Sequence, residues 1–321
     1  LHAIAMRNGL PYSKDMNAFS KQVQFPKESE PDFLEFLSKF KNDWYRNYKD
    51  VEQLTYESVK AMKEDGIFYI ELRFSPEHFA FHNDFDRKEI TDLVIKSANR
   101  AAKDGGFQIR YLLTFNRMKQ TAEEMIELYH ELKVLNHKEV VGVDLAGDET
   151  NYPPEDFAPF FEVVAKDKQY KATVHAGEVS PSSQIWNAIN LLHASRIGHG
   201  VSAIEDKELQ DYLREHGIAL EQCITSNYQT GSWADESTHP FGELYRLGVP
   251  VTINSDDPHI QDTDLTEDYV KAVKYFDLTV DDLEKINLVA IQASFLGEKE
   301  KAALVKSYKS AVQAFRKAHK L

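Results

Sequence analysis

A chain of 321 residues is long enough for one large α/β barrel or for two ordinary domains. The net charge of −14 and the pI near 5.4 argue against a nucleic-acid-binding protein and against binding to anionic membranes, because both functions need a basic surface. The single cysteine, Cys223, excludes an internal disulfide, which favours a cytoplasmic location. No apolar run of the sequence is long enough to span a bilayer.

The first part of the sequence is predicted to be mainly helical. Helical patterns cover 1–8, 32–40 and 51–65, whereas the polar segment 10–29 is predicted to be irregular. Phe33, Phe36 and Phe40 recur at helical spacing, which is typical of core packing. The alternative is that one of these rings forms a wall of a ligand pocket.

From residue 68 onward, predicted strands alternate with predicted helices. The strands are expected at 68–75, 109–116, 140–147, 172–178, 196–200, 218–226 and 250–257. The helices between them are expected at 87–103, 122–135, 154–165, 182–192, 207–216 and 242–247, followed by a helical tail over 266–321 with a break at Gly297. This alternation of apolar strands with helices predicts a parallel sheet covered by helices.

The polar residues of the sequence favour a barrel over an open sheet. An open Rossmann sheet usually has a Gly-rich phosphate loop early in the chain, and the sequence has none. Ionisable residues stand instead at the C-terminal ends of several strands, as in the active site of a TIM (β/α)8 barrel. Seven strands do not close that barrel comfortably, so we expect an eighth strand to be missing before Leu1. Residues 1–321 are therefore predicted to form one (β/α) barrel domain that is incomplete at its N-terminus.

Two strand ends carry candidate metal ligands, His175 and Asp256. A catalytic zinc site takes nitrogen and oxygen ligands and keeps one position open for water. Taken singly, each residue could equally be a hydrogen-bonded histidine or a helix-capping aspartate. Their shared position at strand ends favours a metal site. No lysine stands at the strand end near Asp144 to bridge two metal ions, which favours one ion per chain.

Two further residues are candidates for acid–base chemistry. Glu178 lies three residues beyond His175, where a metal and partial burial would pull its pKa in opposite directions, as suits a proton shuttle. The alternative is a carboxylate stabilised by a helix N-terminus. His199 lies between two glycines, which makes a packed core histidine less favoured, and it is a candidate to orient or deprotonate a metal-activated water.

Asp257 and Gly147 are candidates for contact with a substrate. Asp257 directly follows Asp256, and two adjacent carboxylates repel each other unless a cation or a proton intervenes. The conflict is relieved if one of them binds the metal and the other binds the substrate. Gly147 ends another predicted strand, where a glycine would let a backbone N–H approach a ligand.

Four segments, at 143–149, 175–178, 196–200 and 253–258, resemble the signature segments of the adenosine deaminase family of the amidohydrolase superfamily, in the same order and at similar spacing. The segments 71–76 and 223–227 resemble the bacterial members in particular. The resemblance covers nearly the whole chain. It implies a Zn²⁺-dependent hydrolytic deamination of adenosine or 2′-deoxyadenosine, small-molecule purine nucleosides, to inosine or 2′-deoxyinosine plus ammonia, as in purine salvage.

The resemblance also implies a role for each matching position. His175 and Asp256 would bind zinc, while Glu178 would protonate purine N1. His199 would position the attacking water at C6, and Asp257 would hold N7. The backbone of Gly147 would meet N3, and Phe36 would lie on a lid helix over the ribose.

One family feature has no match in this sequence. The family's His-x-His pair and the Leu-Asp-Gly that follows it are absent, and the segment beginning at His2 is not that pair. Two of four protein ligands for zinc are therefore expected to be absent. A chain that starts at Leu1 is expected to bind zinc weakly or not at all and to have little activity. The alternatives are a deaminase of adenine or another 6-aminopurine derivative, and a metal-free, inactive barrel that binds purines or a partner. The sequence does not predict an oligomeric state.

Overall fold

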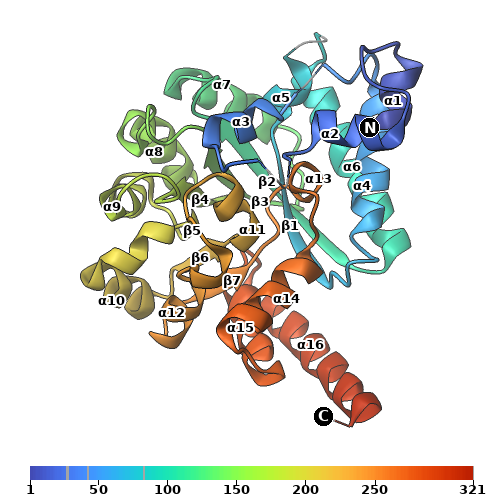
Figure 1. Ribbon diagram of the computed structural model, residues 1–321. Coiled ribbons are helices and arrows are strands. Elements are labelled where there is room, and N and C mark those ends of the chain that lie inside the picture. Colours follow the sequence, from blue (N-terminus) through green and yellow to red (C-terminus); the bar gives the residue numbers. More distant parts are fainter. Residues whose placement is uncertain (27–28, 42, 82–83, 321) are drawn as a thin grey trace.

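The computed structural model describes residues 1–26, 29–41, 43–81 and 84–320. Its centre is a sheet of seven parallel strands in the order of the sequence, surrounded by helices (Figure 1). The strands are β1 (Tyr69–Phe74), β2 (Gln108–Asn116), β3 (Val140–Ala146), β4 (Lys171–Ala176), β5 (Arg196–His199), β6 (Ala219–Gln222) and β7 (Val251–Ile253). Pairing in sequence order, with a helical crossover after each strand, is the pattern of a (β/α) barrel.

The sheet is strongly curled. Strands β1 and β6 are five positions apart in the sheet, which would be roughly 24 Å in a flat sheet. Arg73 of β1 nevertheless forms an ion pair with Glu221 of β6. In the described part of the chain β1 pairs only with β2, and β7 pairs only with β6. The predicted barrel class, with seven strands in view, is confirmed.

Helices connect the strands and continue at both ends of the chain. The first half contains α1 (His2–Arg7), α2 (Met16–Val23), α3 (Phe33–Ser38), α4 (Tyr48–Ala61), α5 (Pro76–Ala80), α6 (Arg87–Gly105) and α7 (Ala122–Lys133). The second half contains the 3-10 helices η1 (Pro154–Phe157), η2 (Val201–Glu205) and η3 (Glu236–Thr238), and the α-helices α8 (Ala158–Asp167), α9 (Ser182–Leu192), α10 (Lys207–His216), α11 (Ile224–Gln229), α12 (Phe241–Arg246), α13 (Pro258–Gln261), α14 (Leu265–Phe276), α15 (Val280–Ala293) and α16 (Glu298–His319).

Several local predictions are wrong: the strand predicted at 250–257, for example, covers only Val251–Ile253. The strand predicted at 218–226 ends at Gln222, and α11 begins at Ile224, so the buried run is shared between a strand and a helix. Burial of the whole run hides the period that would separate the two. The segment 10–29 contains α2, which begins after Asp15, whose side chain accepts a hydrogen bond from the N–H of Ala18 as an N-cap.

The barrel interior contains a buried network of charges. The Arg196 guanidinium pairs with both Glu71 and Glu221 and lies 4.0 Å from the ring centroid of Phe295. Glu221 also accepts from Arg73 and from Thr173 Oγ1. Because each buried charge has an opposite charge and hydrogen bonds, the desolvation penalty is offset. The network joins β1, β4, β5 and β6 beneath the strand ends that carry the candidate site residues.

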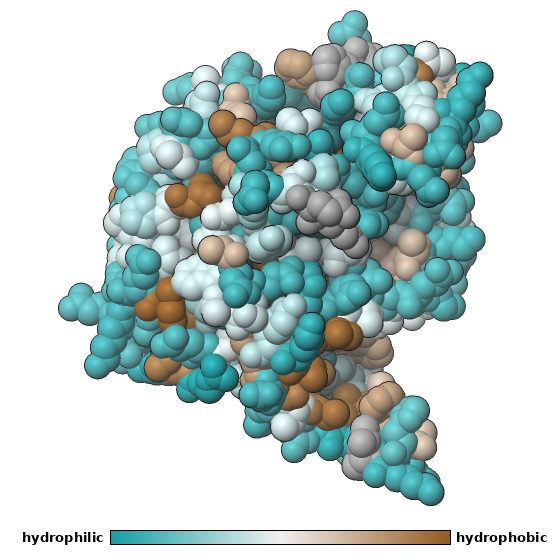
Figure 2. Space-filling model, viewed as in Figure 1, coloured by the Kyte–Doolittle hydropathy of each residue, from teal (hydrophilic) through white to brown (hydrophobic). Residues whose placement is uncertain are grey.

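The surface is mainly hydrophilic on the face that Figure 2 shows. Hydrophobic side chains gather over α14–α16, where Val270, Val273 and Phe315 are exposed. None of the described helices combines the length and the apolar character needed to cross a membrane.

Candidate metal and catalytic site

Three predicted residues meet at the C-terminal edge of the sheet. His175 lies in β4, His199 is the last residue of β5, and Asp256 follows β7. One ligand atom from each residue lies within 4.8 Å of the others. Because parallel strands end at the same edge, residues that are 81 positions apart in the chain come together here.

His175 is held in a defined tautomer. Its Nδ1 lies 3.1 Å from the carbonyl oxygen of Leu145 and 2.9 Å from Asp144 Oδ1. A carbonyl oxygen only accepts, so Nδ1 carries a proton and Nε2 is the nitrogen that could bind a metal. Burial disfavours the charged ring, but the Asp144 carboxylate outweighs it and raises the pKa of His175 to about 9, so a cation that binds at Nε2 must displace a proton there.

Asp256 and His199 both adopt a strained backbone. Their φ angles are 54° and 58°, in the left-handed region that non-glycine residues rarely adopt. Ser226 Oγ donates to Asp256 Oδ2 at 2.8 Å, and Gln222 Nε2 donates to the carbonyl oxygen of His199. Such strain is concentrated at functional sites, where the surrounding contacts hold it in place.

Glu178 faces His199 from the loop between β4 and α9. Its Oε2 lies 3.6 Å from His199 Nε2, and both side chains are buried. Burial raises the pKa of Glu178, against the attraction of His199, and Glu149 raises it further. Ser182 begins α9 four residues later, so Glu178 is not in the first helical turn and the helix-dipole interpretation does not describe it. A buried carboxyl with a raised pKa can donate and recover a proton.

Asp257 lies beside Asp256 and keeps a proton more readily. Burial and the Asp256 charge raise the pKa of Asp257 well above its usual range. The pKa of Asp256 is lowered, because His199 and His175 outweigh the effect of burial. A protonated Asp257 carboxyl can donate a hydrogen bond, for example to a ring nitrogen.

Gly147 and Phe36 occupy different surroundings. Gly147 has φ +107°, and a Cβ there would lie 3.1 Å from Asn116 Oδ1 and 3.2 Å from Arg117 Cγ, so the position requires glycine. Phe36 is buried, and its ring packs against Phe25 and Phe40. This contact agrees with the core-packing interpretation for Phe36, whereas Phe40 is exposed.

The segment around α3 lies over the strand ends. The N–H of Asp32 donates to the carbonyl of Gln229 at the end of α11, and the N–H of Phe25 donates to that of Ile260 in α13. Both acceptors belong to segments that follow β6 and β7. Phe36 is therefore carried on a segment at the rim of the barrel.

The structure adds residues to which the sequence assigned no role. Arg117 is fully buried, and its guanidinium donates to the carbonyl oxygens of His175 at 2.7 Å and Tyr152 at 3.1 Å. Asn227 lies 3.1 Å from His199 Nδ1, and His239 lies 3.0 Å from Asn227. The only sequence signal for Asn227 is its place in the segment 223–227. Arg117 and His239 have none.

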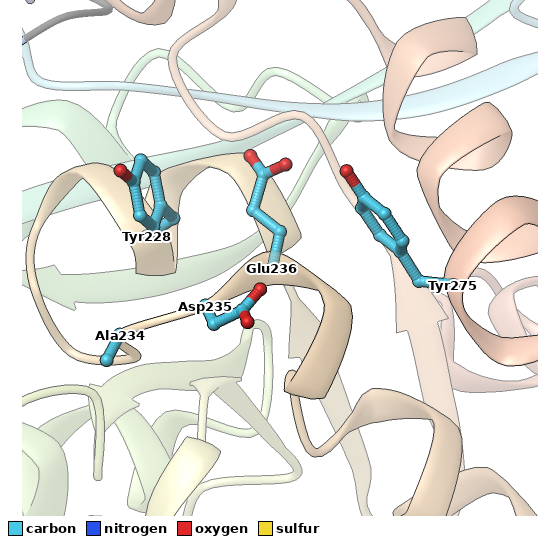
Figure 3. Close-up of a pocket in the computed structure, with 5 residues that line it drawn as sticks. All are labelled: Tyr228, Ala234, Asp235, Glu236 and Tyr275. Atoms are coloured by element: carbon cyan, nitrogen blue, oxygen red, sulfur yellow. The ribbon is translucent and has the colours of Figure 1, made fainter.

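A hollow of about 410 Å³ lies elsewhere. It is lined by residues of α11, η3 and α14 and of the segment between α11 and η3. Figure 3 shows the hydroxyls of Tyr228 and Tyr275 and the carboxylate of Glu236 on the same side of this hollow. Glu236 is paired with Lys271 at 2.6 Å. None of the lining residues belongs to the predicted site.

Comparison with known proteins decides the family. A sequence model described as adenosine deaminase matches residues 1–311. The chain belongs to the adenosine deaminase family. An adenosine deaminase of Klebsiella pneumoniae is 36% identical over 281 residues, which cover 86% of this chain and 83% of that protein. Membership of the adenosine deaminase family makes this protein an aminohydrolase enzyme.

Solved structures share the fold of this adenosine deaminase family member. The adenine deaminase of Arthrobacter aurescens superposes with a TM-score of 0.87 at 23% identity, covering 97% of this chain and 93% of that one. The N6-methyl-AMP deaminase of Arabidopsis thaliana superposes with a TM-score of 0.79 at 24% identity, covering 97% and 90%. At these identities the likeness supports the barrel fold.

Proposed function

We propose that this chain catalyses the Zn²⁺-dependent hydrolytic deamination of adenosine and 2′-deoxyadenosine to inosine and 2′-deoxyinosine, with release of ammonia. The observation that carries the proposal is the convergence of Glu178 and His199, 3.6 Å apart, beside His175 and Asp256 in a member of the adenosine deaminase family. These groups supply an acid, a hydrogen-bonding imidazole and two metal donors at one strand edge. Water replaces the 6-amino group, so adenosine and water give inosine and ammonia.

The described residues supply two donors of the kind that a divalent metal ion takes. His175 Nε2 and the Asp256 carboxylate would hold it, because nitrogen and oxygen donors suit zinc and both side chains are oriented by neighbours. The metal, when bound, supplies Lewis-acid activation of a water molecule. His2 does not join them, since it lies in α1 with its Nε2 3.2 Å from the carbonyl of Ser13.

The remaining steps belong to the chain itself. Glu178 gives its proton to purine N1, which makes C6 electrophilic, and the water oxygen attacks C6 in the orientation set by His199. The Asp257 carboxyl donates to N7, and the backbone N–H of Gly147 donates to N3. Phe36, at the barrel rim, closes the ribose side of the site. One proton of the water passes to the 6-amino group and the other returns to Glu178, so cleavage of the C6–N bond releases ammonia and leaves Glu178 protonated as before.

A deaminase of adenine or of another 6-aminopurine derivative is the second candidate. The shared fold with the adenine and N6-methyl-AMP deaminases favours it, since the same barrel holds those substrates in other proteins. We also propose that residues 1–321 form one domain, because one core cluster includes side chains from β2 to β7 and partly buried side chains of β1 pack against it. The acidic charge of the chain and its lone buried cysteine agree with work in the cytoplasm.

The test is metal content together with turnover. The purified protein is assayed for zinc, and the loss of the adenosine absorbance band is followed as inosine forms, with adenine and N6-methyl-AMP in parallel. We expect turnover of adenosine, and Glu178→Gln should reduce kcat by about 100-fold or more, because the amide cannot protonate N1. Turnover of adenine or N6-methyl-AMP but not of adenosine would transfer the activity to the second candidate. A metal-free protein that binds purines without turnover would refute both.

A further inference from the structure

A chain of hydrogen bonds holds His199 at Nδ1, the ring nitrogen turned away from Glu178. Asn227 Nδ2 lies 3.1 Å from His199 Nδ1, and Asn227 Oδ1 lies 3.0 Å from His239 Nε2. The backbone N–H of Phe241 donates to His239 Nδ1 at 3.2 Å. All three polar side chains are at most 3% exposed, so water does not compete for these bonds.

The backbone N–H of Phe241 fixes which group donates and which accepts in each of these hydrogen bonds, because a backbone N–H can only donate. His239 Nδ1 therefore accepts, which leaves the ring proton on Nε2. Burial lowers the pKa of His239 to about 3, in agreement with a neutral ring. His239 Nε2 must then donate, so the Asn227 atom that it faces is the carbonyl Oδ1.

The amide of Asn227 transmits that direction to His199. With Oδ1 occupied by His239, the Nδ2 amino group points to His199 Nδ1 and donates to it. The backbone of Asn227 is fixed as well, because its N–H donates to the carbonyl of Cys223 at 2.8 Å and its carbonyl accepts from Trp233 N at 2.9 Å. An amide flip would place two donors face to face at His239.

We propose that Asn227 and His239 are positioning residues that hold His199 with its proton on Nε2, the nitrogen that faces Glu178. A ring whose Nδ1 accepts an amide hydrogen donates a hydrogen bond from Nε2 into the site. His199 therefore orients the attacking water by donating to it and neither deprotonates that water nor binds a metal ion through Nε2.

His175 has its hydrogen bond in the opposite sense, because its Nδ1 donates whereas that of His199 accepts. The two neighbouring histidines therefore have different roles. Its Nδ1 donates to Leu145 O, so Nε2 is the nitrogen that is left to bind a cation once its proton is displaced. The ring centroids of His175 and His199 are 5.1 Å apart. Of the three donor groups that lie within 4.8 Å of one another, His175 and Asp256 are thus metal donors, and His199 is a hydrogen-bond donor.

The test uses an isosteric substitution that exchanges donor and acceptor in the hydrogen bond at His199 Nδ1. In Asn227→Asp, one carboxylate oxygen still accepts from His239, and the other requires a proton from His199 Nδ1. We expect kcat for adenosine to fall about 100-fold or more, with KM changed less than about threefold. Asn227→Ala, which adds no charge, is the second variant and should lower kcat about 10-fold. Asn99→Asp, at an asparagine whose Oδ1 accepts from Tyr111 Oη, is the matched control for added charge and should leave both constants unchanged.

Nitrogen NMR of histidine-labelled protein gives a readout that does not depend on activity. Two-bond nitrogen–proton correlations distinguish protonated from unprotonated ring nitrogens, and the His199 signals are those lost in His199→Gln. We expect the His199 proton on Nε2 in the wild type and on Nδ1 in Asn227→Asp. In Asn227→Ala we expect one proton that exchanges between the two nitrogens. A wild-type proton on Nδ1, or a pattern unchanged in both variants, would overturn the proposal.

The kinetic part rests on the proposed function, whereas the spectroscopic part does not. A protein that shows the expected tautomers but leaves adenosine unchanged would refute the proposed function and support the role of Asn227 and His239. A protein that deaminates adenosine with the His199 proton on Nδ1 would do the reverse.

Discussion

Glu149 Oε1 accepts a hydrogen bond from the backbone N–H of Val179 at 2.5 Å, one residue beyond the proposed acid Glu178. The same oxygen accepts from Ser180 N at 3.0 Å, and the Glu149 side chain is buried. A carboxylate from the loop after β3 therefore fixes the loop after β4. The contact fixes the backbone next to Glu178 and thereby sets where the Glu178 carboxyl lies. A small displacement of a reacting group can cost about 100-fold in rate.

Glu149→Ala should impair catalysis through this loop. The substitution removes both acceptor contacts, and we expect kcat for adenosine to fall about 10- to 100-fold with a smaller change in KM. Glu149→Gln keeps an acceptor oxygen and should retain most of the activity, which makes it the matched control. Steady-state kinetics of the two variants, with melting temperatures to monitor folding, give the answer. Equal activity in Glu149→Ala and the wild type would exclude the positioning role.

Asp144→Asn should weaken metal binding. Asp144 is fully buried and lies 2.9 Å from His175 Nδ1, where it fixes the ring with Nε2 toward the site. Loss of such a partner typically weakens metal affinity by about 10- to 100-fold. Competition with a chelator for zinc measures the change. Thr114→Val removes only the 3.1 Å hydrogen bond from Thr114 to Asp144 and should have a much smaller effect. A larger loss of zinc affinity in Thr114→Val than in Asp144→Asn would contradict the role given to Asp144.

Asp268 should make folding stability depend on pH. Burial raises its pKa to about 6, against hydrogen bonds from Thr225 and the nearby Lys271 charge, while Glu236 acts in the same sense as burial. The unfolded chain has an ordinary Asp pKa of about 3.9, so the folded state binds the proton more tightly. Stability contributed by the protonated carboxyl is present below pH 4 and is lost as the pH rises through 6. The total is up to about 3 kcal/mol.

Asp268→Asn should remove that dependence. The difference in unfolding free energy between the variant and the wild type is measured at pH 5 and at pH 7.5. It should shift in favour of the variant by roughly 1–2 kcal/mol at the higher pH. Urea denaturation at the two pH values measures it. The matched control is Asp104→Asn, the same substitution at an exposed aspartate that accepts a hydrogen bond from the Tyr56 hydroxyl. A constant difference between Asp268→Asn and the wild type would show that Asp268 ionises normally in the fold.

The strand ends were predictable from the sequence because the signals are local. A buried β-branched run that ends in an ionisable residue and a breaker places His175, His199 and Asp256 at one edge once the sheet is parallel. The boundaries of α9 and α10 match their predictions, 182–192 and 207–216. In α10 the N-cap Asp206 and the left-handed Gly217 are both recognisable in the sequence.

The supporting residues were not predictable, because their contacts join distant parts of the chain. Asn227 and His199 are 28 positions apart, and Arg117 and His175 are 58 apart. No local pattern encodes such a pair, since each depends on how curled strands bring their following loops together. The strand predicted through Ser226 also hid α11, which carries Asn227. The positions at the strand ends were therefore predictable, whereas the contacts that orient them were not.

Arg196→Met should destabilise the fold by removing the cationic partner of a buried carboxylate. Arg196 is buried, its Nη1 donates to Glu71 Oε2 at 2.7 Å, and its Nε donates to Glu221. Removing one member of a buried ion pair costs about 3–5 kcal/mol, because the remaining charge stays desolvated. Arg73 still compensates Glu221, so the loss should fall mainly on Glu71. Glu71 also accepts from the backbone N–H of Phe295, which links the network to the end of α15.

The double variant Glu71→Gln/Arg196→Met separates the pair from the packing. If the cost comes from an unpaired carboxylate, neutralising Glu71 should recover part of it, and the double variant should be more stable than Arg196→Met alone. Urea unfolding of the wild type, both single variants and the double variant gives the coupling free energy. Additive losses would show instead that Arg196 stabilises the barrel through its contact with Phe295 rather than through charge.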